Sequence, residues 1–304
     1  MSVVVKALTK SYGNQKAVNA VSFELKKGEI AGFIGPNGSG KSTTMKCICG
    51  ILPPDSGTIE VGGIDVHRNK LEVKKIIGYL PEHNPLYLDM YVREYLTHID
   101  GFYKNKTNRK KRLDEIIELT GLTVEMHKRI GQLSKGYRQR VGLAQSLIHN
   151  PEVLILDEPT TGLDPNQIIE IRNTISKLSV YKTVLLSTHI LQEVEAICDR
   201  IIIINQGEIV ANDSSKNIRS SKDKNFQTIF LELSTVVTPE LLNKIKGISK
   251  VQKVSEKEFL IAGNSKDDLR EKIFTFAAEN KLTILTIQKK EETLEQAFRK
   301  LTTG

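Results

Sequence analysis

A glycine-rich stretch near the N-terminus carries the residue types that bind phosphate groups. Residues 35–43 read GPNGSGKST and match the pattern G-x-x-x-x-G-K-[ST]. Its glycines let successive backbone N–H groups surround phosphate oxygens without Cβ clashes. An apolar run before it and a helical pattern after it argue against a chance glycine-rich turn. We expect a nucleoside triphosphate to be held by Gly35, Pro36, Asn37, Gly38, Ser39, Gly40, Lys41, Ser42 and Thr43.

Two acidic residues end an apolar run farther along the chain. The run VLILDEPT would deliver Asp157 and Glu158 to the C-terminal edge of a parallel sheet. There Asp157 and the Ser42 hydroxyl can hold Mg²⁺. Glu158 can act as general base for an attacking water, and Lys41 can reach the β- and γ-phosphates. Such an acidic pair is common by itself, but beside a phosphate loop it predicts hydrolysis of the nucleotide.

For two other residues the sequence allows both a contact with the ligand and a purely structural role. His189 follows a third apolar run, LLSTHI, where an imidazole can contact a γ-phosphate or serve only the structure. Tyr12 in SYGNQ can stack on a base or simply pack.

A second phosphate-facing stretch lies about ninety residues after the first. LSKGYRQRVGLAQ, residues 133–145, places Ser134 and Gly136 at the start of a helical pattern. The N-terminus of a helix favours anions. One domain would then carry two phosphate-facing loops.

The elements that must position these residues are predicted to be α/β. Short β-branched runs alternate with helical stretches up to about residue 206, which indicates a parallel core sheet. The first sixty-odd residues predict an antiparallel β layer instead. Residues 86–150 predict a helical subdomain, whose basic run at 103–112 is a solvated surface or a site for an acidic partner. We expect this nucleotide-binding domain to span residues 1–215.

A polar stretch at residues 212–225 marks a change of domain. We expect a linker at residues 216–226 and an accessory domain at residues 227–304. The predicted order β-α-β-β-α-β fits a small α+β domain of the ferredoxin-like type. Its basic residues are too dispersed to predict nucleic-acid binding.

Composition limits the classes of protein that fit. The chain has 304 residues, a formal net charge of +8 and 39% hydrophobic residues, and the sequence lacks an apolar run long enough to span a bilayer. Its start lacks the apolar segment of a signal peptide, so a cytosolic location is expected. The cysteines Cys47, Cys49 and Cys198 form no metal or disulfide pattern and are expected as free thiols.

The stretches GPNGSGKST, LSKGYRQR, LILDEPTTGLD and STH, in this order, resemble the ATP-binding subunit of an ABC transporter. The resemblance covers residues 1–206. It implies that two cassettes pair head to tail, with each ATP between the phosphate loop of one subunit and the signature loop of the other. The two phosphate-facing loops would then serve two different nucleotides, as two-fold symmetry allows.

Carried onto this sequence, the resemblance implies further roles. Tyr12 would stack on adenine, Ser134 and Gly136 would bind the opposite γ-phosphate, and His189 would sense that group's presence. The stretch ending in Asp164, TTGLD, would cross the dimer interface.

The sequence departs from the family pattern at two places. Lys135 and Tyr137 replace a glycine and a glutamine of the signature. Glu82 stands where the family has a glutamine that contacts Mg²⁺, and we expect it to remain a magnesium-linked residue of the coupling loop. The Tyr- and Leu-rich residues 84–96 that follow are either interface anchors for a permease or core of the helical subdomain.

Together these features predict a transport-coupled ATPase that uses ATP and Mg²⁺. The C-terminal extension and LPEHNPLY most resemble the bacterial export-type branch, especially gliding-motility-associated subunits. The expected partners are a second cassette and an integral membrane permease, which would place the chain at the inner face of the cell membrane; no direct contact with nucleic acid is expected. The alternatives are a soluble ABC ATPase acting on ribosomes or DNA and a nucleotide-gated regulatory subunit.

Overall fold

The computed structural model describes residues 1–103, 108–219, 226–265, 267–290 and 293–302. These residues form two compact units. The first contains Met1–Ser215 together with Lys300–Gly304, and the second contains Lys216–Arg299. Each unit has a hydrophobic core of its own. Residues 104–107 of the predicted basic run lie outside the described residues.

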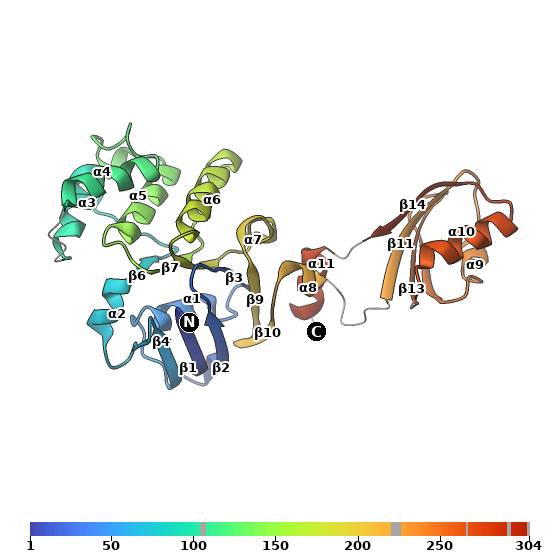
Figure 1. The fold of residues 1–304 in the computed structure, drawn as a ribbon, viewed down its shortest axis with the longest axis horizontal. Coiled ribbons are helices and arrows are strands. Elements are labelled where there is room, and N and C mark those ends of the chain that lie inside the picture. Colours follow the sequence, from blue (N-terminus) through green and yellow to red (C-terminus); the bar gives the residue numbers. More distant parts are fainter. Residues whose placement is uncertain (104–107, 220–225, 266, 291–292, 303–304) are drawn as a thin grey trace. The chain divides into compact units, whose positions relative to one another are not determined.

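A six-stranded sheet forms the centre of the first unit (Figure 1). Its order is β10 (Glu208–Asp213), β9 (Arg200–Asn205), β3 (Ile30–Ile34), β8 (Thr183–Ser187), β7 (Val153–Asp157) and β6 (Ile77–Leu80). All neighbours pair in parallel except β10 with β9. Every residue of β3, β7 and β8 is buried, as the continuous apolar runs predict.

A second sheet of the first unit is antiparallel, and its side chains share a hydrophobic core with the parallel sheet. Its order is β2 (Gln15–Leu25), β1 (Val3–Tyr12), β4 (Ser56–Val61) and β5 (Ile64–Asp65). Side chains of this layer pack with those of α1 (Lys41–Ile48), β7 and β9 in one cluster. The predicted combination of a parallel sheet and an antiparallel layer is therefore confirmed.

Three helices form the predicted helical subdomain. They are α3 (Val92–Gly101), α4 (Arg109–Leu119) and α5 (Lys135–Leu147), and Figure 1 shows them gathered together. A short 3₁₀ helix, η1 (Ile130–Gln132), precedes α5. Arg109 and Arg112 of the basic run pair with the buried carboxylate of Asp100, at 2.5 and 3.5 Å. Part of the basic run thus has a structural role within the subdomain.

The remaining helices of the first unit are α2 (Lys70–Ile76), α6 (Pro165–Ser179), α7 (Leu191–Ile197) and α8 (Ser215–Arg219), the last of which runs into the second unit. Helix α6 begins at an Asp-Pro pair. The Asp164 carboxylate accepts a 2.9 Å hydrogen bond from the backbone N–H of Gln167, and Pro165 occupies the first turn. Its buried stripe contains Ile171, Ile175 and Leu178.

The second unit is a four-stranded antiparallel sheet with helices on one side (Figure 1). Its order is β12 (Ile248–Lys253), β13 (Glu258–Asn264), β11 (Phe226–Leu233) and β14 (Ile284–Lys290), and the helices are α9 (Pro239–Leu242) and α10 (Leu269–Glu279). This order is that of a ferredoxin-like sheet. Within the polar stretch at residues 212–225, β10 ends at Asp213 and α8 follows, while residues 220–225 lie outside the described part.

Helix α11 (Leu294–Thr302) ends in the first unit, because Lys300–Gly304 belong to it. There the Asn205 side-chain amide donates a 3.2 Å hydrogen bond to the Thr302 carbonyl.

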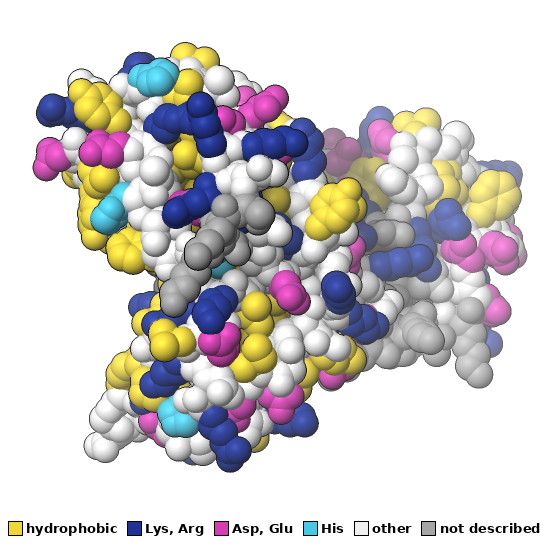
Figure 2. Space-filling view, turned by 60° about the vertical axis from the view of Figure 1, so that its left-hand side comes forward, with side chains coloured by type: hydrophobic (Ala, Val, Ile, Leu, Met, Phe, Trp, Pro, Cys, Tyr) yellow, Lys and Arg dark blue, Asp and Glu magenta, His cyan; other side chains and the backbone are white. Residues whose placement is uncertain are grey.

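Across the described ranges, no helix is both long enough and apolar enough to cross a membrane. Figure 2 shows Lys and Arg side chains distributed among acidic and apolar ones on the face it draws.

Candidate functional site

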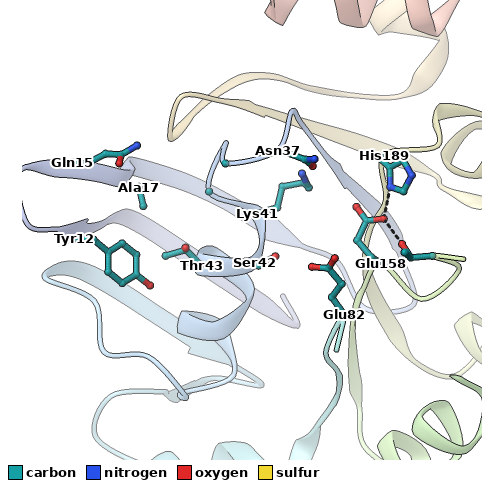
Figure 3. Close-up of a pocket in the computed structure, with 13 residues that line it drawn as sticks. Tyr12, Gln15, Ala17, Asn37, Lys41, Ser42, Thr43, Glu82, Glu158 and His189 are labelled. Carbon is teal, nitrogen blue, oxygen red and sulfur yellow. Dashed lines mark hydrogen bonds and ion pairs between the residues drawn. The ribbon is translucent and has the colours of Figure 1, made fainter. Parts of the chain in front are cut away.

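A cavity of about 570 Å³ lies where β3, β6, β7 and β8 of the first unit end. Its size suits a nucleotide, since ligand pockets commonly measure about 300–1,000 Å³. Figure 3 shows its lining residues from the antiparallel layer on one side and from the strand ends on the other. They are Tyr12, Gln15, Ala17, Asn37, Gly38, Gly40, Lys41, Ser42, Thr43, Glu82, Glu158, Thr161 and His189.

The phosphate loop, residues 35–43, runs from the end of β3 into the first turn of α1 and requires glycine at two crowded positions. A Cβ on Gly35 would collide with the Ile204 carbonyl, and one on Gly40 would collide with the Ala17 carbonyl. Gly40 also has φ 106°, a left-handed conformation that glycine adopts without strain. The loop can therefore expose its backbone N–H groups closely, which is what a phosphate site needs.

Lys41 is held against the same loop. Its ammonium donates hydrogen bonds to the carbonyls of Gly35, at 2.8 Å, and Pro36, at 3.1 Å. Burial lowers the pKa of the Lys41 side chain. Negative charge facing it opposes that effect and comes, in decreasing order, from Glu158, Asp157 and Glu82. The lysine thus sits between the phosphate loop and the acidic side of the cavity, where a triphosphate would bind.

The acidic pair at the end of β7 is fixed by the neighbouring strand. The Ser187 hydroxyl donates a 2.6 Å hydrogen bond to the Asp157 carboxylate and accepts one of 2.9 Å from the backbone N–H of Glu158. Glu158 has φ 51°, a left-handed conformation that is rare for residues other than glycine. Strain of this kind persists only where the surroundings impose it, and it is typical of functional sites.

The Glu158 carboxylate has two side-chain partners. One oxygen accepts a 3.1 Å hydrogen bond from the Thr161 hydroxyl and lies 2.7 Å from Nδ1 of His189 (Figure 3). The Glu158 side chain is 9% exposed, whereas that of His189 is 57% exposed. The structure therefore brings the predicted base and the predicted phosphate-sensing histidine into direct contact.

Glu82 follows β6 and lines the cavity opposite the phosphate loop. Figure 3 shows its carboxylate directed into the space in front of Ser42 and Lys41. Of the predicted metal ligands, Ser42 and Glu82 line the cavity, while Asp157 is 1% exposed and is not among the lining residues. All three present oxygen atoms, the donor type that Mg²⁺ prefers.

The second phosphate-facing loop does not line this cavity. Ser134 is exposed and begins α5, where its hydroxyl accepts a 3.4 Å hydrogen bond from the backbone N–H of Tyr137. Gly136 is buried, and a Cβ there would collide with the Gln167 side chain. Asp164 begins α6 and is also absent from the cavity wall. Within one chain these three residues form no part of the nucleotide cavity.

Other predicted residues lie at or near the cavity, together with three that were not predicted, one of which is Thr161 beside Glu158. Tyr12 is 53% exposed at the wall, and Pro36 and Ser39 line a smaller adjoining depression. Gln15 and Ala17 also line the cavity although sequence motifs did not indicate them. Gln15 pairs with Tyr12 across the β1–β2 turn. The signal that could have indicated Gln15 is the turn at Gly13 and Asn14, since strands paired across such a turn place Gln15 opposite Tyr12.

The Tyr- and Leu-rich segment at residues 84–96 divides between core and surface. Val92, Tyr95 and Leu96 are buried in the helical subdomain. Tyr87, Leu88 and Tyr91 of this segment are exposed instead, and together with Phe102 at the end of α3 they form an exposed aromatic surface, with exposed fractions between 45% and 71%. The segment therefore contributes both to the core of the helical subdomain and to a surface that could anchor an interface.

Comparison with known proteins places this site in context. Residues 18–161 match the family model described as ABC transporter. The ATP-binding protein YxlF of Bacillus subtilis, named an uncharacterized ABC transporter protein, is 34% identical, covering 98% of this chain and 98% of its own. The bacitracin transport ATP-binding protein BcrA of Bacillus licheniformis is 34% identical, covering 100% of this chain and 99% of its own.

A similar solved structure is the dimeric, post-hydrolysis state of the ATP-binding cassette MJ0796 bound to ADP and Pi. It superposes with a TM-score of 0.65 at 27% identity, covering 70% of this chain and 98% of that chain. The two sequence relatives extend over nearly the full chain, including its second unit, whereas the solved cassette does not.

Proposed function

The chain belongs to the ABC transporter family as an ATP-binding, ATP-hydrolysing subunit, and we propose that Mg·ATP occupies the cavity with its base on Tyr12 and its phosphates in residues 35–43. The glycine cradle and the charge of Lys41 support this orientation. One further observation fits it: the buried Ser39 hydroxyl has no hydrogen-bond partner among the described residues, and it lies within the phosphate loop. The observation that carries the proposal is the contact of Glu158 with His189 opposite Lys41.

In the proposed hydrolysis, Glu158 takes the proton of the attacking water. Thr161 and His189 orient its carboxylate, and His189 also contacts the γ-phosphate. Mg²⁺ would be held through the oxygens of Ser42, Asp157 and Glu82, and when bound it would neutralise charge on the β- and γ-phosphates. Their oxygen-donor chemistry fits that ion.

We further propose that two copies close head to tail around two nucleotides. Ser134 and Gly136 would contact the γ-phosphate held by the opposite copy, and the loop ending in Asp164 would lie at the interface. Their absence from the cavity of a single chain supports this arrangement, because a separate phosphate-facing helix start then has its own ligand. The solved cassette that resembles this chain is dimeric.

The permease is proposed to dock on the aromatic surface defined by Tyr87, Leu88, Tyr91 and Phe102. Exposed aromatic side chains of this kind are enriched at the centres of interfaces. We propose export as the direction of transport, a direction that fits bacitracin transport, for which a relative of this chain is named. The subunit would then work at the inner face of the cell membrane.

We also propose that the chain belongs to the export-type branch with a C-terminal extension, nearest to gliding-motility-associated subunits. The full-length match to YxlF and BcrA supports a shared extension. The proposed limits are a nucleotide-binding domain at residues 1–215, a linker at 216–226 and an accessory domain at 227–304.

Glu158→Gln tests the proposed chemistry. The glutamine side chain has the same shape as that of glutamate and can accept a hydrogen bond from the Thr161 hydroxyl. Because it cannot take a proton from water, the rate of ATP hydrolysis should fall at least about 100-fold. Mg·ATP should still bind, and light scattering should show a stable dimer at saturating Mg·ATP. Glu195→Gln, an exposed carboxylate on α7, is the matched control and should hydrolyse ATP normally. A Glu158→Gln protein with unchanged turnover would contradict the role of the base, and one that stays monomeric would contradict the dimer.

A further inference from the structure

A buried carboxylate outside the nucleotide cavity joins the two loops that carry Glu158 and His189. Glu193 lies on α7 and is 2% exposed. Its Oε2 atom accepts hydrogen bonds from the hydroxyls of Thr160, at 2.8 Å, and Thr188, at 2.9 Å. Thr160 is two residues after Glu158, and Thr188 immediately precedes His189. One carboxylate oxygen therefore connects the segments that follow β7 and β8.

A carboxylate oxygen only accepts hydrogen bonds, so both threonine hydroxyls donate to it, and a third contact fits this direction for Thr188. The backbone N–H of Ile190 donates a 3.0 Å hydrogen bond to the Thr188 hydroxyl oxygen. The Thr188 hydroxyl proton is thereby left to the Glu193 carboxylate. Both threonine hydroxyls are consequently oriented by Glu193, and the backbone before His189 is held with them.

A second cross-link lies close by in sequence and serves the same pair of loops. Ser187 joins the end of β8 to Asp157 and to the backbone of Glu158. This contact fixes the start of the β7 loop, but not the segment after Glu158. The left-handed conformation of Glu158 persists only where its surroundings impose it, and Thr160, held by Glu193, lies on the C-terminal side of Glu158.

A carboxylate in such a place is costly for stability. Burying it is unfavourable unless hydrogen bonds compensate, and its other oxygen, Oε1, has no partner within the described part of the chain. Packing alone would favour an apolar side chain there. What the carboxylate adds is a fixed spacing between two loops whose reactive groups must stay about 2.7 Å apart.

We propose that Glu193 is a positioning residue that sets the geometry of Glu158 and His189 for hydrolysis. The proposal rests on the catalytic roles proposed above for those two residues. Glu193 acts through the Thr160 and Thr188 hydroxyls and does not touch the nucleotide. Its loss should therefore impair turnover and leave nucleotide binding almost unchanged, because Tyr12 and the phosphate loop lie on other elements.

Steady-state ATP hydrolysis by the full chain tests this separation of turnover from binding. Glu193→Ala should lower kcat about 10- to 100-fold, as the loss of such supporting groups commonly does, with KM for ATP within about twofold of the parent. Glu195→Ala, on the exposed side of the same helix, should leave both constants unchanged. Thermal unfolding with and without Mg·ATP reports whether each variant folds and binds.

Thr160→Val and Thr188→Val provide a test that keeps side-chain shape. Combined, they should reproduce the loss of kcat, and Thr188→Val should cost little when added to Glu193→Ala, since residues of one network are not additive. If Glu193→Ala fails to fold, the two threonine variants decide the question. Unchanged kcat in the folded variants, or a rise in KM equal to the fall in kcat/KM, would overturn the proposal.

Glu158→Gln and His189→Ala, measured in the same assay, separate this proposal from the catalytic roles on which it rests. If both abolish turnover while Glu193→Ala and the threonine pair do not, only the positioning role fails. If neither affects turnover, the proposed catalytic roles fail and the positioning role fails with them.

Discussion

At the scale of single residues, the nucleotide cavity is built from short contiguous sequence motifs and from hydrogen bonds between residues that are far apart in sequence. Residues 35–43 and the pair Asp157–Glu158 could be predicted because each motif has its own strand, loop or helix context. The links of Ser187 to Asp157 and of Thr160 to Glu193 could not, because they join common residues 30 and 33 positions apart. The parallel pairing of β7 with β8 places Ser187 opposite Asp157, and the segments that follow both strands then lie close enough for Thr160 to reach Glu193 on α7.

Glu82 provides a residue-scale prediction, because it places a carboxylate where the family has an amide. Glu82→Ala should lower turnover roughly 10-fold and raise the Mg²⁺ concentration needed for half-maximal activity, since one oxygen near the ion is lost. Glu82→Gln keeps a carbonyl oxygen and should retain most of the turnover. Titrating Mg²⁺ at fixed ATP measures both effects. If Glu82→Ala and Glu82→Gln each show the parent's turnover and the parent's dependence on Mg²⁺, a metal-linked role for Glu82 is excluded.

At the scale of elements, the loop after β6 is packed against the helix that begins with Ser134. Asn84 lies over Gly142 of α5, and its side-chain amide donates a 3.3 Å hydrogen bond to the Arg138 carbonyl. Most helices were predictable from periodic stretches and most strands from short β-branched runs, whereas α8 lies in the predicted linker. Strand β6 was not, because IGYL is short and contains a glycine, which weakens a strand pattern.

Gly142→Ala should test the packing of that loop on α5. The added Cβ would collide with the Asn84 amide and lie 2.7 Å from Leu80 Cδ1. Overpacking of this kind costs about 1–3 kcal/mol, partly offset by the better helix propensity of alanine. We expect a lower free energy of unfolding in a denaturant titration. Gly101→Ala, near the end of α3 with open space around it, is the control and should be neutral or stabilising. Equal stability of the two variants would show that the Asn84 contact contributes nothing.

At the scale of the whole molecule, the chain is two units with separate cores. One unit holds the entire nucleotide cavity, and the other has a core of its own centred on β11 and β13. Composition and the polar stretch indicated a second folded segment. They gave no sign that α11 would end in the first unit, where the Asn205 side-chain amide donates to the Thr302 carbonyl, because these residues are 97 positions apart in sequence.

Separate cores predict separate responses to nucleotide in calorimetry. Mg·ATP binds the folded first unit, so at about 100 times Kd it should stabilise that unit by about 2.7 kcal/mol and raise its Tm by roughly 5–10 °C. The transition of the second unit should not move. Lys41→Ala should abolish the shift because phosphate affinity is lost. A nucleotide-dependent shift of both transitions by the same amount would show that the units unfold as one.

The hydrogen bond from Asn205 to Thr302 has a consequence for biosynthesis. During translation, Thr302 leaves the ribosome after the whole of the second unit, since residues 216–299 precede it. Domains generally fold as they emerge, N-terminal first. Here the N-terminal unit acquires one of its own hydrogen bonds only after the second unit has been synthesised.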